Sequence, residues 1–156
     1  MTTKLLEPYL ILDFTDDRGE IGPMLLGDLG ADVIRVETPD GSAARRCPPF
    51  VDTDRDDLRS LQFLAFNRNK RSIVLDPAQP DDCATLAQLI ERADFVFESG
   101  RTLASAYDLD VEETRTINNR IVHVRLTAFG DDGPHAEFLS NDLTIVAMAG
   151  PIALQG

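Results

Sequence analysis

The segment NRNKRS, at Asn67–Ser72, is the densest group of cationic side chains in the sequence and the first candidate for binding an anion. It holds Arg68, Lys70 and Arg71 directly ahead of an apolar segment. Guanidinium and ammonium groups in such a place can bind a phosphate group of a ligand. The alternative is that these cations form surface ion pairs with nearby carboxylates, which contribute little free energy. Physical reasoning alone favours the surface pairs.

Carboxylate clusters are the second candidate, because hard cations prefer oxygen ligands. Asp13, Asp16 and Asp17 lie close together in the sequence, but a magnesium site would need a second such group facing them. The run DTDRDD, at residues 52–57, resembles the start of a calcium loop. Its sixth residue is Asp rather than Gly and its twelfth, Phe63, is not Glu, so we interpret it as a solvated acidic loop.

The cysteines and histidines complete a short set of possible metal ligands. The sequence has two of each, and the two cysteines are too far apart for a metal knuckle or a redox pair. We therefore assign no metal site. A structural role is expected for His123, which alternates with two valines in a strand-like segment. The residues concerned are Cys47, Cys83, His123 and His135.

A dinucleotide site is the third candidate. In a Rossmann fold the first turn after a strand carries G-x-G-x-x-G, whereas the turn here has only Gly19 and Gly22. Glu37 ends the next predicted strand, where a ribose-binding acid would lie. One acid at a strand end is weak support, so a nicotinamide-dependent oxidoreductase is a hypothesis that lacks its glycine motif.

These residues lie on a regular alternation of short β-rich runs and amphipathic helical runs. The alternation predicts right-handed β-α-β units and an α/β fold with an open parallel sheet. Helices are predicted at Glu20–Leu29, Ser60–Phe66, Asp81–Ala93, Val111–Asn118 and Asn141–Ala149. Strands are predicted at Tyr9–Phe14, Asp32–Glu37, Ser72–Asp76, Asp94–Glu98 and Arg120–Thr127.

Ligands of open parallel sheets bind beyond the carboxyl ends of the strands. The connection at residues 38–60 is long and polar, which is typical of a functional or mobile loop. The segments that follow the predicted strands are Thr15–Gly19, Thr38–Gly41, Pro77–Gln79, Ser99–Thr102 and Ala128–Pro134.

Length and composition limit the class of protein. A chain of 156 residues suffices for one domain with its own core, and 43% of its residues are hydrophobic. The net charge of −12 argues against a nucleic-acid or anionic membrane surface. Neither a signal peptide nor an apolar segment long enough to cross a bilayer is recognisable, so we expect a cytoplasmic protein.

Several segments together resemble the family III CoA-transferases of the CaiB/BaiF type, which include formyl-CoA and carnitine CoA-transferases and α-methylacyl-CoA racemase. LGDLGADVIRVE and NRNKRSIVLD are the specific signals, and order and spacing agree over nearly the whole chain. The resemblance implies a single Rossmann-like domain over residues 1–156, the N-terminal part of the family's large domain. The matching segments are Ile11–Thr15, Gly22-Pro23, Leu26–Glu37, Asn67–Asp76, Ala93–Ser99, Ala128–Pro134 and Asn141–Gly150.

The resemblance also implies a reaction, in which CoA moves from an acyl-CoA donor to a carboxylic acid acceptor through an aspartyl intermediate. In the family, that aspartate belongs to a Gly-Asp pair downstream of the segment matching Asn141–Gly150, so we assign no catalytic residue here. Gly27-Asp28 and Gly130-Asp131 lie in other motifs and are not substitutes. The family's second domain and catalytic segment are expected to be absent from this chain.

The resemblance implies coenzyme A or acyl-CoA as substrate, and no tightly bound cofactor. Thr38 stands where the family frequently has an arginine, and Asp16 and Arg18 replace other polar residues of the first turn. In the full-length protein a homodimer or a complementing subunit is expected. The alternative is a non-catalytic degenerate domain that binds CoA weakly or serves as an assembly partner. The expected CoA contacts are Asp16, Arg18, Thr38, Leu75, Ser99, Gly100 and Arg101.

Overall fold

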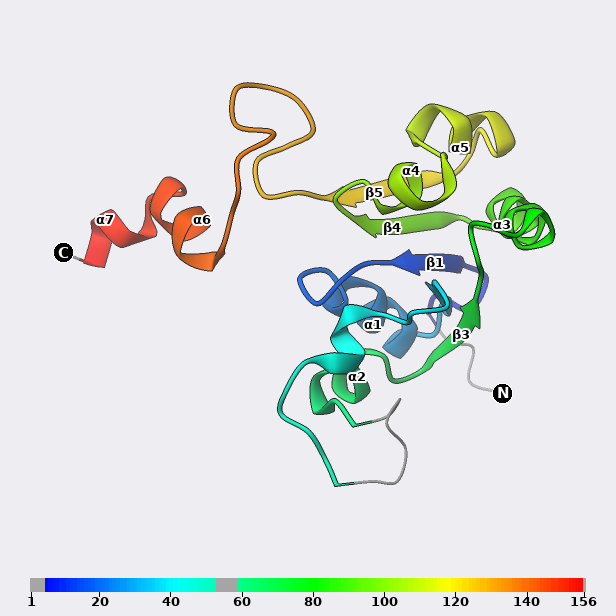
Figure 1. Cartoon of the computed structure of the whole chain (residues 1–156), viewed down its shortest axis with the longest axis horizontal. Helices are drawn as coiled ribbons and strands as arrows, with labels where there is room; N and C mark the ends of the chain where they lie inside the picture. The colour runs from blue at the N-terminus through cyan, green and yellow to red at the C-terminus, as the bar shows by residue number, and fades with distance from the viewer. Residues whose placement is uncertain (1–4, 53–58, 156) are drawn as a thin grey trace. The chain divides into compact units, whose positions relative to one another are not determined.

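The computed structural model describes residues 5–52 and 59–155 and divides the chain into two compact units, Met1–Arg125 and Leu126–Gly156. The larger unit is built on a five-stranded sheet with the strand order β3-β2-β1-β4-β5 (Figure 1). β1 pairs in parallel with β2 and β4, and β2 pairs in parallel with β3. The predicted α/β fold with an open parallel sheet is therefore confirmed. The strands are β1 (Leu10–Phe14), β2 (Asp32–Glu37), β3 (Lys70–Val74), β4 (Phe95–Ser99) and β5 (Val122–Leu126).

The two faces of the sheet bury different kinds of side chain. One face packs against α3 (Pro80–Arg92), α4 (Thr102–Tyr107) and α5 (Val111–Ile117) and forms the main apolar core. Because side chains alternate along a strand, the opposite face of β1 and β2 takes Asp13 and Arg35 together with apolar residues. The main core contains Leu12, Phe14, Ile34, Val36, Leu75, Leu86, Ile90, Ala93, Val96, Leu103 and Ile121.

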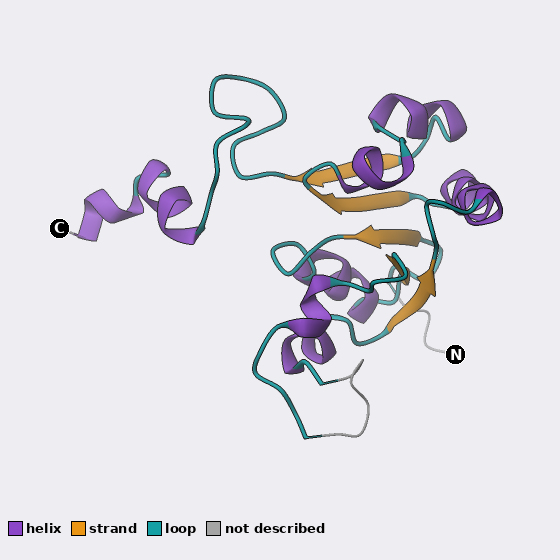
Figure 2. Cartoon of the chain, viewed as in Figure 1, coloured by secondary structure: helices purple, strands orange, loops and turns teal. Residues whose placement is uncertain are grey.

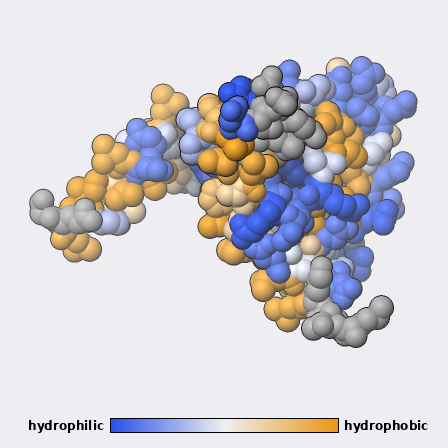
Figure 3. Space-filling model, turned by 90° about the horizontal axis from the view of Figure 1, so that it is seen from below, coloured by the Kyte–Doolittle hydropathy of each residue, from blue (hydrophilic) through white to orange (hydrophobic). Residues whose placement is uncertain are grey.

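The helix α1 (Ile21–Asp28) covers the second face through small residues. A Cβ atom built on Gly22 would lie 3.6 Å from the Phe97 ring, and one on Gly27 would lie 3.4 Å from Val33. The apolar side that the sequence predicts for this helix is only partly buried. Met24 is buried, but Ile21, Leu25 and Leu29 are about half exposed. Figure 3, which shows the molecule from below the view of Figure 1, has several groups of apolar residues at its surface.

Helix ends follow from short local signals. α3 begins with Pro80 and has Asp81 and Asp82 in its first turn, where a proline costs no hydrogen bond and acids complement the helix dipole. Asp110 and Glu113 form a reciprocal capping box at the start of α5. These signals place α3 and α5 within two residues of the predicted helices (Figure 2).

Three elements of the larger unit differ from the prediction. β3 spans Lys70–Val74 rather than Ser72–Asp76, because it pairs with β2 from Val33↔Lys70 to Glu37↔Val74. The helix α4 was not predicted. The long connection after β2 contains the 3-10 helix η1 (Ala43–Arg46) before α2 (Leu61–Phe66), which lies where a short helix is predicted.

The second unit holds the helices α6 (Asp142–Met148) and α7 (Pro151–Gln155), of which only α6 was predicted. Asn141 and Thr144 form a capping box that starts α6, and no side chain of this helix is buried. The candidate ligand segment at residues 128–134 belongs to this unit. Over the described parts of the chain, no helix is both long enough and apolar enough to cross a membrane.

Candidate functional site

The strand order reverses between β1 and β4, and this reversal defines the place where open parallel sheets bind ligands. The turns that leave these two strands touch, since the backbone N–H of Asp16 donates to Ser99 Oγ at 3.0 Å. A Cβ atom on Gly19 would lie 2.9 Å from the Thr15 side chain and 3.1 Å from Ser99 Oγ. The close approach of the two turns therefore requires glycine at position 19.

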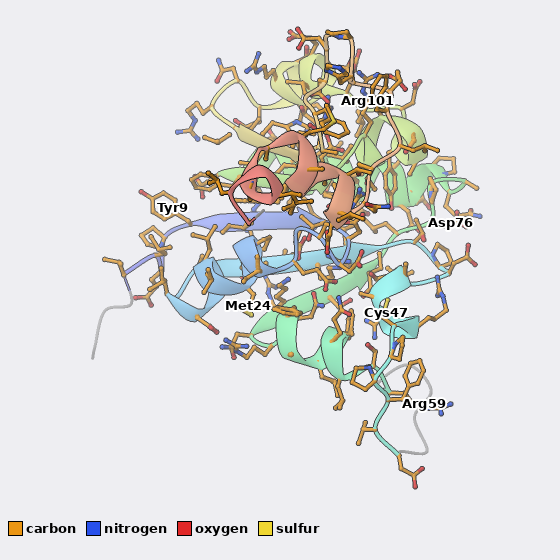
Figure 4. All side chains as sticks on the ribbon, turned by 90° about the vertical axis from the view of Figure 1, so that its left-hand side faces the viewer. Tyr9, Met24, Cys47, Arg59, Asp76 and Arg101 are labelled. Carbon is orange, nitrogen blue, oxygen red and sulfur yellow. The ribbon has the colours of Figure 1, made fainter. Side chains whose placement is uncertain are left out.

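A hollow of about 160 Å³, called here the edge hollow, opens beside this contact. One wall comes from the turn after β1, and the other comes from the end of β2 with the start of η1. Thr102 and Tyr107 of α4 complete it. Figure 4 shows the side chains from this side, with Arg101 marking the β4–α4 turn and Cys47 the end of η1. The lining residues are Phe14, Thr15, Asp16, Arg35, Val36, Glu37, Thr38, Gly41, Ser42, Ala43, Thr102 and Tyr107.

An aromatic pair forms the apolar part of the edge hollow. The rings of Phe14 and Tyr107 meet edge to face with their centroids 6.2 Å apart. Tyr107 Oη donates to the carbonyl oxygen of Leu75 at 2.9 Å. Burial of Tyr107, helped by the nearby Cys83, raises the pKa of its hydroxyl to about 12. The hydroxyl therefore stays neutral and ties α4 to the segment after β3.

A buried cluster of charges adjoins the edge hollow and reaches its lining through Arg35. Asp13 is fully buried, and its Oδ1 accepts hydrogen bonds from the backbone N–H and the hydroxyl of Thr15. Arg35 Nη1 lies 3.1 Å from the same oxygen, and Lys70 Nζ lies 2.7 Å from Oδ2. Glu20 is also fully buried, 3.3 Å from Arg35 Nη2. Two acids and two bases thus compensate one another beneath the first turn.

The basic cluster at Asn67–Ser72 divides into two kinds of residue. Arg68 pairs with Asp28 at 2.6 Å and Arg71 with Asp32 at 2.5 Å, and all four side chains are at least 30% exposed. The surface pairing favoured by physical reasoning is confirmed for these two arginines. Lys70 behaves differently, because its side chain is only 1% exposed. Burial lowers the pKa of Lys70, and the adjacent Asp13 opposes that effect.

Glu37, the candidate ribose-binding acid, has no acceptor capacity left for a ribose. Oε1 accepts from Arg45 Nη2 at 2.6 Å and from Ser72 Oγ at 2.9 Å. Oε2 accepts from Arg45 Nε at 2.7 Å and from the backbone N–H of Ser42 at 2.8 Å. Burial alone would raise the pKa of Glu37, but these hydrogen bonds lower it to about 2. The guanidinium of Arg45 also stacks 3.9 Å from the centre of the Phe63 ring.

A fourth buried carboxylate, Glu98, links β4 to β5 and α4 on the other side of the strand reversal. Its Oε1 meets His123 Nε2 at 2.8 Å and accepts from Arg125 Nε at 2.7 Å. Its Oε2 accepts from the backbone N–H of Leu103 in α4. Burial raises the pKa of Glu98, but the hydrogen bonds, first that of His123, outweigh it and lower the pKa below its usual value. His123 has the structural role expected for it.

The structure gathers some of the expected CoA contacts at one place. Asp16 and Thr38 line the edge hollow from opposite walls, and Ser99 lies beneath Asp16. Arg18 forms a bidentate ion pair with Asp16. Partial burial raises the pKa of Asp16, but the hydrogen bonds from Arg18 and Ser99 outweigh it and lower the pKa below its usual value. Leu75 is buried and only 2% exposed. Its contact with the lining of the edge hollow is made by its carbonyl oxygen, which accepts the hydrogen bond from Tyr107.

The last two expected contacts lie beside this group. Gly100 has a φ of +64°, a conformation that favours glycine, and a Cβ there would meet nothing within 4 Å. Arg101 precedes α4 and lines a second hollow of about 320 Å³ with Ala104, Asp110 and Arg125. Sequence reasoning missed Arg35, Ser42 and Tyr107 as lining residues, whereas Thr102 belongs to the candidate segment Ser99–Thr102. The only signal among them is Arg35, a charge inside the apolar strand DVIRVE.

The described residues contain no group of three or more His, Cys, Asp or Glu side chains placed to hold a metal ion. Asp54, Asp56 and Asp57 of the calcium-like run lie outside the described residues. The two thiols are separate, with Cys47 Sγ 3.6 Å from the carbonyl oxygen of Ala43 and Cys83 Sγ 3.4 Å from that of Pro77.

Comparison with known proteins identifies curated CoA-transferases as relatives of this chain. Succinate–glutarate CoA-transferase of Agrobacterium fabrum is 39% identical over 136 residues, which is 85% of this chain and 34% of that protein. Formyl-CoA:oxalate CoA-transferase of Streptomyces avermitilis is 35% identical over 99% of this chain and 37% of its own length. This chain thus spans little more than a third of these curated relatives.

Solved structures agree with the sequence relatives. A CaiB/BaiF family protein from Brucella suis matches with a TM-score of 0.81 and 35% identity, over 96% of this chain and 40% of that one. Rv3272 of Mycobacterium tuberculosis matches with a TM-score of 0.78 and 34% identity, over 96% of this chain and 41% of that one. The sequence model of the family matches residues 6–156. The chain belongs to CoA-transferase family III.

Proposed function

We propose that this chain is the CoA-binding part of an enzyme that moves CoA from an acyl-CoA donor to a carboxylic acid acceptor. The observation that carries the proposal is the edge hollow, which opens beside the strand reversal of a family III fold. The named relatives support the substrate class, because one is a succinate–glutarate and another a formyl-CoA:oxalate CoA-transferase. A small carboxylic acid is accordingly the proposed second substrate.

The proposed chemistry uses an aspartate that this chain does not supply. Its carboxylate attacks the donor thioester carbonyl, and the CoA thiolate leaves as an acyl-aspartyl anhydride forms. The thiolate then attacks the aspartyl carbonyl and releases the donor acid. The acceptor carboxylate attacks the resulting aspartyl-CoA thioester, and the thiolate returns to the acceptor's acyl group as the aspartate is freed. A relative from M. tuberculosis has been solved with an aspartate replaced by alanine.

In this mechanism the chain binds and orients CoA and takes no part in bond making. The proposed contacts are those at the strand reversal, with cations from Arg18 and Arg101 near the anionic groups of CoA. No acyl transfer is expected from the 156-residue chain alone. We propose that the complete protein is cytoplasmic, and that the aspartate comes either from a longer chain that forms a homodimer or from a complementing subunit. The proposed contact residues are Asp16, Arg18, Thr38, Leu75, Ser99, Gly100 and Arg101.

Calorimetric titration of the chain with CoA tests the proposal. Saturable binding is expected, and Arg101→Gln is expected to weaken it about threefold to tenfold by removing one charged contact. Arg92→Gln is the matched control, because it makes the same charge change among the amino ends of the strands. It is expected to leave the affinity unchanged. Absence of heat at millimolar CoA would overturn the proposal, and tight binding of NADH instead would favour an oxidoreductase.

Acyl transfer requires a second experiment on the protein as its native cells produce it. An intact mass well above 17.2 kDa and transfer activity with a panel of acyl-CoA donors are the expected results. CoA binding without any transfer would favour the alternative, a non-catalytic domain that binds CoA or serves as an assembly partner.

A further inference from the structure

Arg35 lies in the middle of β2, and its guanidinium group contacts two loops that are far apart in the sequence. Nη1 donates to Thr15 Oγ1 at 3.3 Å and to Asp13 Oδ1 at 3.1 Å. Nη2 donates to Ser42 Oγ at 2.8 Å. The side chain is only 4% exposed. One planar group therefore joins the turn after β1 to the start of η1.

The two loops are the opposite walls of the edge hollow, since Thr15 and Ser42 both line it. We infer that Arg35 is a positioning residue for CoA binding, which sets the separation of these walls through its two terminal nitrogens. The inference rests on the proposed function, because it assumes that CoA occupies the edge hollow. It assigns to Arg35 no contact with the reacting atoms.

Charge compensation alone does not explain this arrangement. Asp13 already has a cationic partner in Lys70, which is 2.7 Å from its second oxygen. Arg35 also lies 3.3 Å from Glu20 and so compensates a second buried acid, but neither ion pair accounts for its contact with Ser42 on the other wall. Arg35 Nε is buried without a hydrogen-bond partner, which is costly for an N–H group. Arg35 thus leaves its Nε–H group without a hydrogen bond, while its two terminal nitrogens donate to residues of the two walls.

The geometry of the side chain explains why an arginine performs this role. A guanidinium presents its donors in a rigid planar fork, whereas a lysine ammonium is a single point charge on a flexible stem. A lysine at position 35 could satisfy Asp13 or reach Ser42, but it could not hold both loops at once. Arg35→Lys therefore keeps the charge of the buried cluster and removes the connection between the walls.

The test measures CoA affinity by calorimetry for Arg35→Lys, Ser42→Ala and the double variant. Each single variant is expected to weaken CoA binding about threefold to tenfold, the range expected for one hydrogen bond. Ser42→Ala is expected to have much less effect in the Arg35→Lys background than in the original chain, because the contact is already lost. Ser72→Ala is the control. It likewise removes a serine hydroxyl that hydrogen-bonds a charged side chain, that of Glu37, but Ser72 itself does not line the edge hollow.

Each outcome decides the inference. Single variants that bind CoA as tightly as the unmodified chain, or effects that add in the double variant, would overturn the positioning role and leave the proposed function intact. An unmodified chain that does not bind CoA would overturn the proposed function itself. If Arg35→Lys fails to fold, the CoA affinities of Ser42→Ala and Ser72→Ala are compared instead, and equal affinities refute the inference. A melting temperature for Ser42→Ala within about 3 °C of the original separates positioning from loss of structure.

Discussion

Replacing Glu37 by glutamine removes the charge from a carboxylate that accepts four hydrogen bonds while its side chain is 1% exposed. Its pKa falls from the ordinary value of 4.5 to about 2 in the folded chain. At about 1.4 kcal/mol per pH unit, this difference corresponds to roughly 3 kcal/mol of stability. The partner Arg45 is 20% exposed, so solvent screening reduces the expected loss to about 2–3 kcal/mol at pH 7.

The sign of the pH dependence follows from the lowered pKa. The stability that the ionised Glu37 contributes is fully present above pH 4.5 and is lost as the pH falls towards 2. Urea unfolding of the original chain and of Glu37→Gln should therefore differ by about 2–3 kcal/mol at pH 7 and by less than half of that near pH 3. Glu91→Gln, an exposed acid on α3, is the control and should change stability by less than about 0.5 kcal/mol. A difference that stays constant down to pH 3, or that is absent at pH 7, would refute the reasoning.

Three further predictions concern the rest of this unit. Lys70→Met leaves the buried Asp13 without its closest cation and should lower the free energy of unfolding in urea by about 3–5 kcal/mol. Arg71→Met is the control, because it breaks only the exposed pair with Asp32 and should cost less than about 1 kcal/mol. Gly19→Ala should weaken CoA binding in calorimetry, because its Cβ would lie 2.9 Å from a neighbouring side chain. Gly22→Ala has 3.6 Å available and should leave binding unchanged; equal effects would contradict the close approach. Asp110→Ala removes the capping box of α5 and should lower stability by about 1 kcal/mol in thermal unfolding, and an unchanged melting temperature would show that the cap contributes nothing.

The order of strands and helices was predictable because apolar runs alternate with amphipathic ones throughout the first unit. The bounds of β3 were not, since its first residue is a lysine that the apolar pattern does not mark as part of a strand. Lys70 begins the strand because it pairs with Val33 of β2, and its buried ammonium group is accommodated because Asp13 and the carbonyl oxygen of Glu20 accept its hydrogen bonds. The helix α4 was missed because it is short and has no side-chain cap at Arg101.

The edge of the sheet that carries the hollow was predictable from the sequence, but the residues that line the hollow were not. Rules for parallel sheets indicate which loops surround a site, and they brought Asp16, Thr38 and Ser99 into consideration. They do not say which charged residues turn inward. Asp13 and Arg35 interrupt apolar strands, which is a signal of burial, but their partners are identified only once the strands are paired in register.

Two of the hydrogen bonds beside the edge hollow join residues that are far apart along the chain. Asp13 and Lys70 are 57 positions apart, and Asp16 and Ser99 are 83 positions apart. Closing such long loops costs entropy before any contact compensates for it, which makes these contacts late events in folding. A chain growing on the ribosome would therefore acquire this edge only after Tyr107 has emerged, which is the last of the described residues that line the edge hollow. Under the proposed function, CoA added to a translating ribosome is expected to stabilise only chains that have passed that point.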